Sequence, residues 1–207
     1  MIIEPKITAI NWCSKRIKVS LSLKWLQLPP QNLEMHGNAF TGCLVSIAFP
    51  APIRTMNKSG NFFSGTIDCC KLPCYISYFC VSQNYIYARI DLECLLTLLQ
   101  SLFFGSNALA GPISLTQLPK GMSTLKLRHN QLSETLSFDH LANTFQSLQL
   151  DSNRFSEEID LRVTSSSMCF ILPSRNLFFG AIEITEISRK GFEIHAQPMK
   201  FFSEKLW

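Results

Sequence analysis

The stretch LKLRHNQLSETL, residues 125–136, decides the fold because its pattern returns every 23 residues along the chain. Its central asparagine has counterparts throughout the sequence, and the full set is Asn38, Asn61, Asn84, Asn107, Asn130, Asn153 and Asn176. Apolar residues recur five positions before each asparagine and two and six positions after it. Such regularity does not arise by chance, so the chain is predicted to be an array of similar coils.

Each repeat unit offers one strand with a single buried face. Leu125 and Leu127 alternate with polar neighbours, which is the period of such a strand. One strand cannot bury its own apolar side chains, so successive units are expected to stack in parallel, about 4.8 Å apart. We therefore predict an α/β-type repeat solenoid, mostly β-strand and coil, with a curved parallel sheet on its concave face.

The repeat also predicts how the chain is divided. Nine periods of 23 residues make 207, which indicates one domain over 1–207 with about nine coils. Regular coils are expected at about 26–190, and degraded terminal coils at 1–25 and 191–207.

The recurring asparagine is expected to be a buried turn residue. Its amide has donors and an acceptor for the backbone groups that the end of a strand leaves unpaired. Seven such residues would form a ladder from coil to coil. A buried backbone group without its partner would cost about 1–3 kcal/mol.

A bend follows four residues after each asparagine. Most coils have glycine there, and the full set is Gly42, Gly65, Ala88, Gly111, Glu134, Glu157 and Gly180. Because three coils lack glycine, we predict that this bend does not require a positive φ. Ile159 and Leu161 then alternate around Asp160, which predicts a second short strand at this position of the repeat.

The unit L-x-x-L-x-L-x-x-N-x-L-S-G-x-I-D-L resembles the leucine-rich-repeat superfamily. Its 23-residue N-x-F-S-G-x-I-D-L form is similar to kinetoplastid-protozoan repeat proteins and to plant receptor-like repeat proteins. Asp68, Asp91 and Asp160 match the aspartate of this pattern. The resemblance implies a curved solenoid that binds proteins on its concave sheet. The cysteine-rich caps that usually seal secreted members are missing from the sequence.

Composition and the N-terminal sequence set an expectation for the environment of the chain. It is 46% hydrophobic with a net charge of +4, and its first residues lack the apolar core of a signal peptide. The longest apolar run, residues 95–104, is too short to span a membrane. The default expectation is therefore a cytoplasmic chain whose eight cysteines are free thiols.

Motifs of catalysis and of cofactor binding are not found in the sequence. The four histidines are scattered, and no serine or cysteine has a base partner nearby in sequence. Cys69, Cys70, Cys74 and Cys80 cluster without the spacing of a metal site. We therefore expect no enzyme activity, no catalytic residue, no cofactor and no metal.

Strand residues that point away from the core are the candidates for partner binding. In the middle coils they include aromatic and basic residues, which are enriched at interface hot spots. The predicted partner-binding set is Tyr78, Phe103, Lys126, Arg128, Gln149 and Asp151.

These features favour a protein-interaction scaffold that holds a protein partner on its concave face. One alternative is that the chain is a fragment of a surface or secreted leucine-rich-repeat recognition protein. Another is a nucleic-acid binder that uses Lys126, Arg128, His129 and Arg175, although the modest net charge opposes it. We expect neither a nucleic-acid partner nor a membrane-spanning segment.

Overall fold

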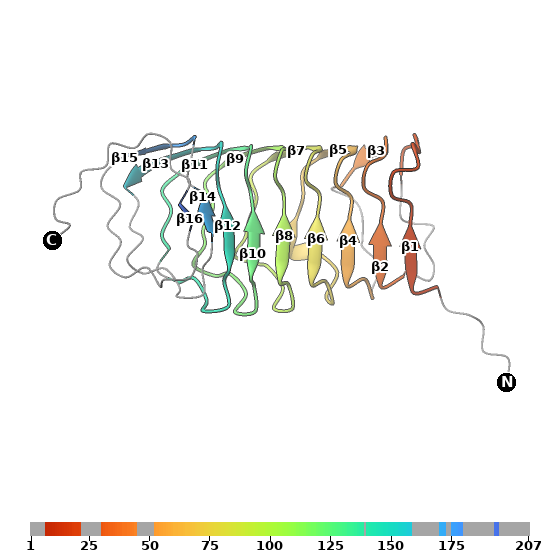
Figure 1. Ribbon diagram of the computed structural model, residues 1–207, viewed down its shortest axis with the longest axis horizontal. Coiled ribbons are helices and arrows are strands. Elements are labelled where there is room, and N and C mark those ends of the chain that lie inside the picture. Colours follow the sequence, from red (N-terminus) through yellow and green to blue (C-terminus); the bar gives the residue numbers. More distant parts are fainter. Residues whose placement is uncertain are drawn as a thin grey trace.

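The computed structural model describes residues 7–21, 30–44, 52–138, 140–158, 170–172, 175–179 and 193–194. These residues form two sheets, and the larger one is parallel and has nine strands (Figure 1). The strands are β1 (Ala9–Asn11), β2 (Asn32–Glu34), β4 (Thr55–Asn57), β6 (Tyr78–Cys80), β8 (Ser101–Phe103), β10 (Thr124–Lys126), β12 (Ser147–Gln149), β14 (Phe170–Leu172) and β16 (Glu193–Ile194). Neighbouring strands pair residues one repeat apart, as Leu102, Leu125 and Leu148 do. The predicted parallel solenoid is therefore confirmed.

A second parallel sheet has seven strands in the described residues. They are β3 (Thr41–Cys43), β5 (Phe62–Gly65), β7 (Tyr85–Ala88), β9 (Ala108–Gly111), β11 (Gln131–Glu134), β13 (Arg154–Glu158) and β15 (Leu177–Phe179). Within the described residues, seven coils thus supply a strand to both sheets, compared with the prediction of about nine coils whose two terminal members are degraded. Among the described residues, a 3-10 turn, η2 (Cys69–Lys71), follows β5. None of the described residues forms a helix long and apolar enough to span a membrane.

The second strand lies earlier in the repeat than the sequence indicated. It falls on the residues just after the asparagine, as in Gln131–Glu134, and the following I-x-L segment is not a strand at residues 67–69 or 90–92. Ile159–Leu161, on which the prediction was based, lies outside the described residues. The alternating I-x-L pattern instead reflects burial, because Ile90 and Leu92 both enter the core.

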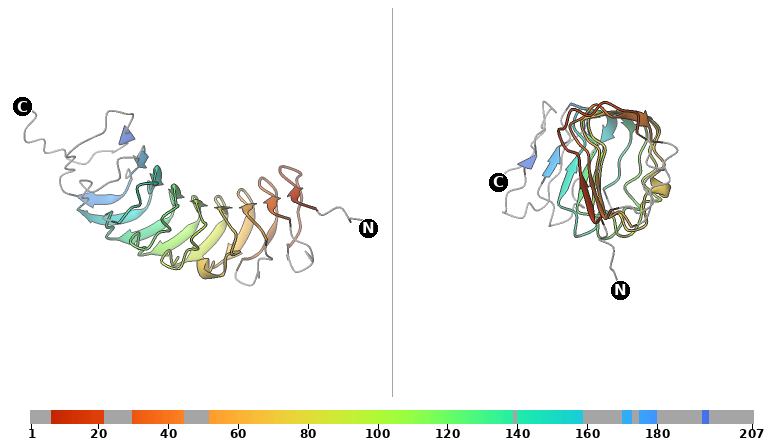
Figure 2. Two further views of the ribbon diagram at one scale, coloured as in Figure 1. Left: turned by 90° about the horizontal axis from the view of Figure 1, so that it is seen from below. Right: turned by 90° about the vertical axis from the view of Figure 1, so that its right-hand side faces the viewer.

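The solenoid curves, and the nine-stranded sheet lines its inner side (Figure 2). One continuous core runs between the two sheets. The residues on either side of Phe103 and Lys126 are buried in this core. They are Leu102, Phe104, Leu125 and Leu127, and none has exposed surface. Alternate strand residues therefore face the concave surface, as the repeat pattern requires.

The bend after the asparagine uses positive φ in coils with and without glycine, so our prediction about it was wrong. Gly65 and Gly111 have φ of 90° and 87°, and Ala88 and Glu134 adopt 78° and 73° at the equivalent position. The parallel second sheet continues through both kinds of coil and holds each to the same path. Ala88 and Glu134 therefore adopt a backbone conformation that disfavours side chains with a Cβ.

One pair of cysteines is not free, which corrects the expectation of eight free thiols. Cys70 and Cys94 form a disulfide, with Cα atoms 5.2 Å apart and a sequence separation of 24. Equivalent residues of adjacent coils lie 23 apart, so stacking brings these two side by side despite their distance in sequence. Cys70 also lines a surface hollow of about 780 Å³ formed by three successive coils.

Burial predicts different reactivity for the remaining thiols. Burial raises the pKa of Cys69 to about 12, with smaller contributions from Asp68 and Asp91, whereas Cys43 and Cys74 are exposed. Because the thiolate is the reactive form, we expect iodoacetamide to modify Cys69 at least about a hundredfold more slowly than Cys43 in the native protein.

Peptide mass spectrometry of the alkylated protein measures these rates. Digestion without a reductant should also release Cys70 linked to Cys94. Equal labelling of Cys69 and Cys43, or an unlinked Cys70, would contradict this description of the cysteines.

Candidate functional site

The repeat asparagines lie where the concave strands end, and each bridges neighbouring coils. Asn130 donates through Nδ2 to the carbonyl oxygens of Phe104 at 3.0 Å, Leu127 at 2.9 Å and Arg128 at 3.3 Å. Its Oδ1 accepts from the backbone N–H of Leu109 at 3.0 Å. The same contact from Nδ2 to a carbonyl 26 residues earlier recurs at Asn38, Asn61, Asn84, Asn107, Asn153 and Asn176. These bonds hold the concave sheet's strand ends in register.

The structure places the residues predicted to bind a partner in three rows across the concave face. Phe103, Lys126 and Gln149 are direct neighbours in one row, on β8, β10 and β12. Tyr78 lies in a second row on β6, and Arg128 and Asp151 follow the ends of β10 and β12 in a third. We call these six residues the concave patch.

An aromatic pair and a cation form the centre of the concave patch. The rings of Tyr78 and Phe103 are tilted, with centroids 5.0 Å apart, and Lys126 Nζ lies 5.2 Å from the centroid of Phe103. All three residues are partly exposed. Burial, followed by the neighbouring Cys80 and Glu34, raises the pKa of Tyr78 to about 12, so its hydroxyl stays protonated at neutral pH. The centre therefore offers an apolar surface with one cation and one neutral hydroxyl.

Cys80 lies on the same face but is only 6% exposed. It pairs laterally with Phe103 in the sheet, and its Sγ lies 3.8 Å from Ser82 Oγ. The alternation of the strand places Cys80 in a solvent-facing row, whereas its burial depends on neighbouring side chains that the repeat pattern does not specify.

Charged groups of both signs lie where the chain leaves β10 and β12. Arg128 leans over Gly105, where a Cβ would come within 3.1 Å of Arg128 Cγ. Asp151 Oδ2 lies 3.9 Å from His129 Nε2. Asp151 Oδ1 is buried, and among the residues that the structure describes it has no hydrogen-bond partner. This end of the concave patch therefore combines an arginine with a partly buried carboxylate.

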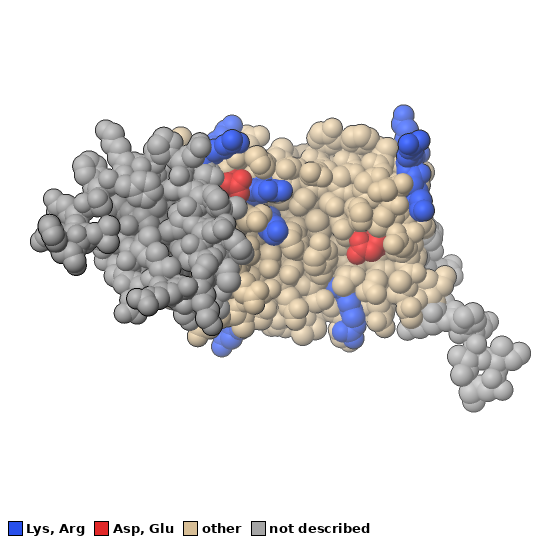
Figure 3. Space-filling view, in the orientation of Figure 1, with Lys and Arg blue, Asp and Glu red and all other residues tan. Residues whose placement is uncertain are grey.

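Most of the described concave face is uncharged (Figure 3). Over β10 and β12, basic side chains lie beside an acidic one. Of the residues suggested for nucleic-acid binding, Lys126, Arg128 and His129 are adjacent in this region, and Arg175 is exposed two coils further along. The cations are thus mixed with a carboxylate and do not form a continuous basic surface.

Two groups of possible metal ligands also come together within the described residues. One is Cys13, Glu34 and His36, and the other is Cys70, Asp91 and Cys94, whose cysteines form the disulfide. The first group was not predicted from the sequence, because its members lie in two different coils. The only signal was that Cys13 and His36 are 23 residues apart, one repeat length.

No protein-family model and no curated protein matches the sequence. Solved structures do resemble it. A TDR receptor is 22% identical with a TM-score of 0.60, over 80% of this chain and 34% of that chain. The LRR ectodomain of the receptor kinase GASSHO1/SCHENGEN3 from Arabidopsis thaliana, in complex with CASPARIAN STRIP INTEGRITY FACTOR 2, is 14% identical with a TM-score of 0.56, over 80% of this chain and 24% of that chain.

A plant ice-binding protein is also similar, with 17% identity and a TM-score of 0.56 over 88% of this chain and 59% of that chain. The chain spans less than two thirds of each of these structures. Together with the repeat and the parallel solenoid, the similarities confirm the leucine-rich-repeat fold.

Proposed function

We propose that the chain binds a protein partner, and not a substrate, through the concave patch. The main support for this proposal is the packing of Tyr78 against Phe103, with Lys126 Nζ over the Phe103 ring. These three residues lie on three adjacent strands. Phe103 is not needed for the core, because Leu102 and Phe104 on either side already fill it. A partly exposed aromatic beside cations suits a segment that carries both apolar and acidic side chains.

The charges of the concave patch favour a protein over a nucleic acid. Nucleic-acid binding rests on several Lys and Arg contacts to phosphates, and the net charge here is only +4. Asp151, 3.9 Å from His129, would repel a phosphate backbone at the point where the cations gather.

Solved neighbours support binding but do not choose the ligand. A receptor ectodomain in complex with a named factor and an ice-binding protein share this fold, and a fold alone does not imply a function. The Cys70–Cys94 disulfide is of a kind that persists in oxidising environments. It favours the alternative in which this chain is part of a surface or secreted recognition protein over the cytoplasmic default.

A random peptide library displayed on phage tests the proposal and does not require an identified partner. Peptides selected on the wild-type chain should be rich in apolar and acidic residues. Their affinity for the double variant Phe103→Ala/Arg128→Ala should fall at least about tenfold, because truncation of a hot-spot residue costs more than about 1–2 kcal/mol. The melting temperature of the double variant should stay close to that of the wild type.

A matched double variant on the opposite sheet provides the control. Tyr85→Ala/Arg89→Ala also removes one exposed aromatic and one arginine, and it should leave peptide affinity unchanged. Peptides that bind both variants as well as the wild type would rule out the concave patch as the site. Selective capture of duplex DNA with steep salt dependence would instead support the nucleic-acid alternative.

A further inference from the structure

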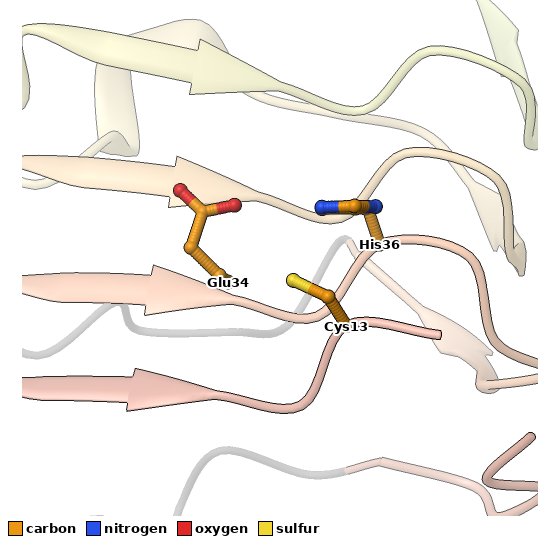
Figure 4. A group of neighbouring side chains, drawn as sticks. All are labelled: Cys13, Glu34 and His36. Carbon is orange, nitrogen blue, oxygen red and sulfur yellow. The ribbon is translucent and has the colours of Figure 1, made fainter. Parts of the chain in front are cut away.

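We propose that Cys13, Glu34 and His36 form a zinc-binding site at the N-terminal end of the concave face. A thiol sulfur, a carboxylate oxygen and an imidazole nitrogen from these residues all lie within 4.8 Å of one another. Figure 4 shows the three side chains projecting from neighbouring chain segments toward a common space. Each residue is partly buried, so the space is sheltered but can be reached from the concave side.

Backbone hydrogen bonds fix the two segments that carry these ligands. Glu34 is at the end of β2, and Trp12 N–H donates to the Glu34 carbonyl oxygen at 2.7 Å. Ser14 N–H donates to the His36 carbonyl oxygen at 2.9 Å, so Cys13 lies between two fixed residues. Asn11 Oδ1 also accepts from Cys13 N–H at 3.0 Å. The three ligands therefore extend from a backbone that needs no rearrangement to bind an ion.

The donor set matches zinc better than other common ions. Zinc binds thiolate, imidazole and carboxylate groups at about 2.0–2.3 Å, and tetrahedral angles then place donor atoms about 3.3–3.8 Å apart. Small side-chain rotations can bring atoms within 4.8 Å to that spacing. Calcium and magnesium prefer oxygen ligands, so a cysteine disfavours them. Thiolate and carboxylate together would balance the charge of the divalent ion.

Three protein ligands leave the fourth tetrahedral position of zinc open. Glu34 shares its sheet row with Asn57, Cys80 and Phe103, so this position would face the same concave surface as the concave patch. Water would fill it, or a carboxylate, imidazole or thiolate from a bound molecule. The site itself rests only on Cys13, Glu34 and His36, and it stands whether or not the concave patch binds a protein.

Zinc titration of the full chain against a chromophoric chelator, with a non-chelating reductant, tests the proposal. We expect one equivalent to bind through this site, with the release of a proton as the Cys13 thiol ionises. Cobalt in place of zinc should give a thiolate-to-metal charge-transfer absorption. Cys13→Ser should abolish that absorption. His36→Ala should weaken zinc binding by more than roughly 10–100-fold, which is the cost of losing a residue that only hydrogen-bonds to a metal ligand.

Control variants separate this site from the other thiols. Cys70→Ser/Cys94→Ser removes the second ligand group, which reduction of the disulfide could open to metal, and Cys43→Ser removes an exposed free thiol. Both should retain the cobalt absorption. Glu34→Gln preserves the shape of the side chain and should still weaken binding, with circular dichroism as the check on folding.

Three results would overturn the proposal. They are no zinc binding by the wild type, equal binding by the wild type and Cys13→Ser, or loss of binding in Cys70→Ser/Cys94→Ser with retention in Cys13→Ser.

Discussion

Replacement of Lys58 by methionine should raise the free energy of unfolding by several kcal/mol at pH 6. Lys58 has no exposed surface, and Nζ lies 5.1 Å from the ring centroid of Phe63. Its position in the repeat is apolar in the adjacent coils, where Met35 and Val81 are also fully buried. Methionine is close to lysine in length and fits such a core position without a charged end.

The pH dependence follows from the effect of burial on this lysine. Burial lowers the pKa of Lys58 from 10.5 to about 7. Between these values the unfolded chain holds a proton that the folded chain has lost, so stability rises with pH across this window. Below about pH 7 both states are protonated, and the cost of the buried charge is present in full. At 1.36 kcal/mol per pKa unit, that cost is on the order of 3–5 kcal/mol.

Urea denaturation of the wild type and Lys58→Met at pH 6 and pH 10 measures this effect. The difference between the two proteins should be large at pH 6 and small at pH 10, and other titrating groups cancel in the comparison. Lys120→Met, at an exposed lysine, should change stability little at either pH. A methionine variant less stable than the wild type at pH 6 would show that Lys58 contributes favourable interactions that outweigh its burial.

The repeat predicted which residues enter the core because each coil supplies nearly the same surroundings to the next. That is why Leu125 and Leu127 could be assigned to the core, and why Phe103 and Lys126 could be placed side by side on the concave face. Even Lys58 followed its position in the repeat into the core, against the ordinary preference of lysine for water.

Features that depend on contacts between side chains of different coils were not predictable in this way. The Cys70–Cys94 disulfide and the grouping of Cys13 with His36 need both the lateral register and the side-chain directions. The 5.0 Å approach of Tyr78 to Phe103 has the same origin. The positive φ of Glu134 was missed for another reason: tolerance of glutamate at one position was taken to mean freedom of the backbone, although the sheet restrains it.

Replacement of Asn130 by alanine should lower the free energy of unfolding by about 2–4 kcal/mol. The variant leaves the backbone N–H of Leu109, a residue with no exposed surface, without the acceptor that Asn130 Oδ1 supplies at 3.0 Å. The carbonyl oxygens are less affected, because Phe104 and Leu127 also accept from Asn107 and Asn153, each at 3.0 Å. The orphaned N–H accounts for about 1–3 kcal/mol, and the lost donations account for the rest.

Two further variants separate hydrogen bonding from side-chain volume in urea denaturation. Asn130→Asp keeps an acceptor for Leu109 but directs a carboxylate oxygen at the carbonyls of Phe104 and Leu127, so at pH 7 it should destabilise at least as much as alanine. Gln131→Ala removes an adjacent exposed amide and should change stability by less than about 0.5 kcal/mol. If Asn130→Ala were as mild as Gln131→Ala, the asparagine bonds would not stabilise the stack of coils. Curvature and register would then depend on the sheets and the apolar core alone.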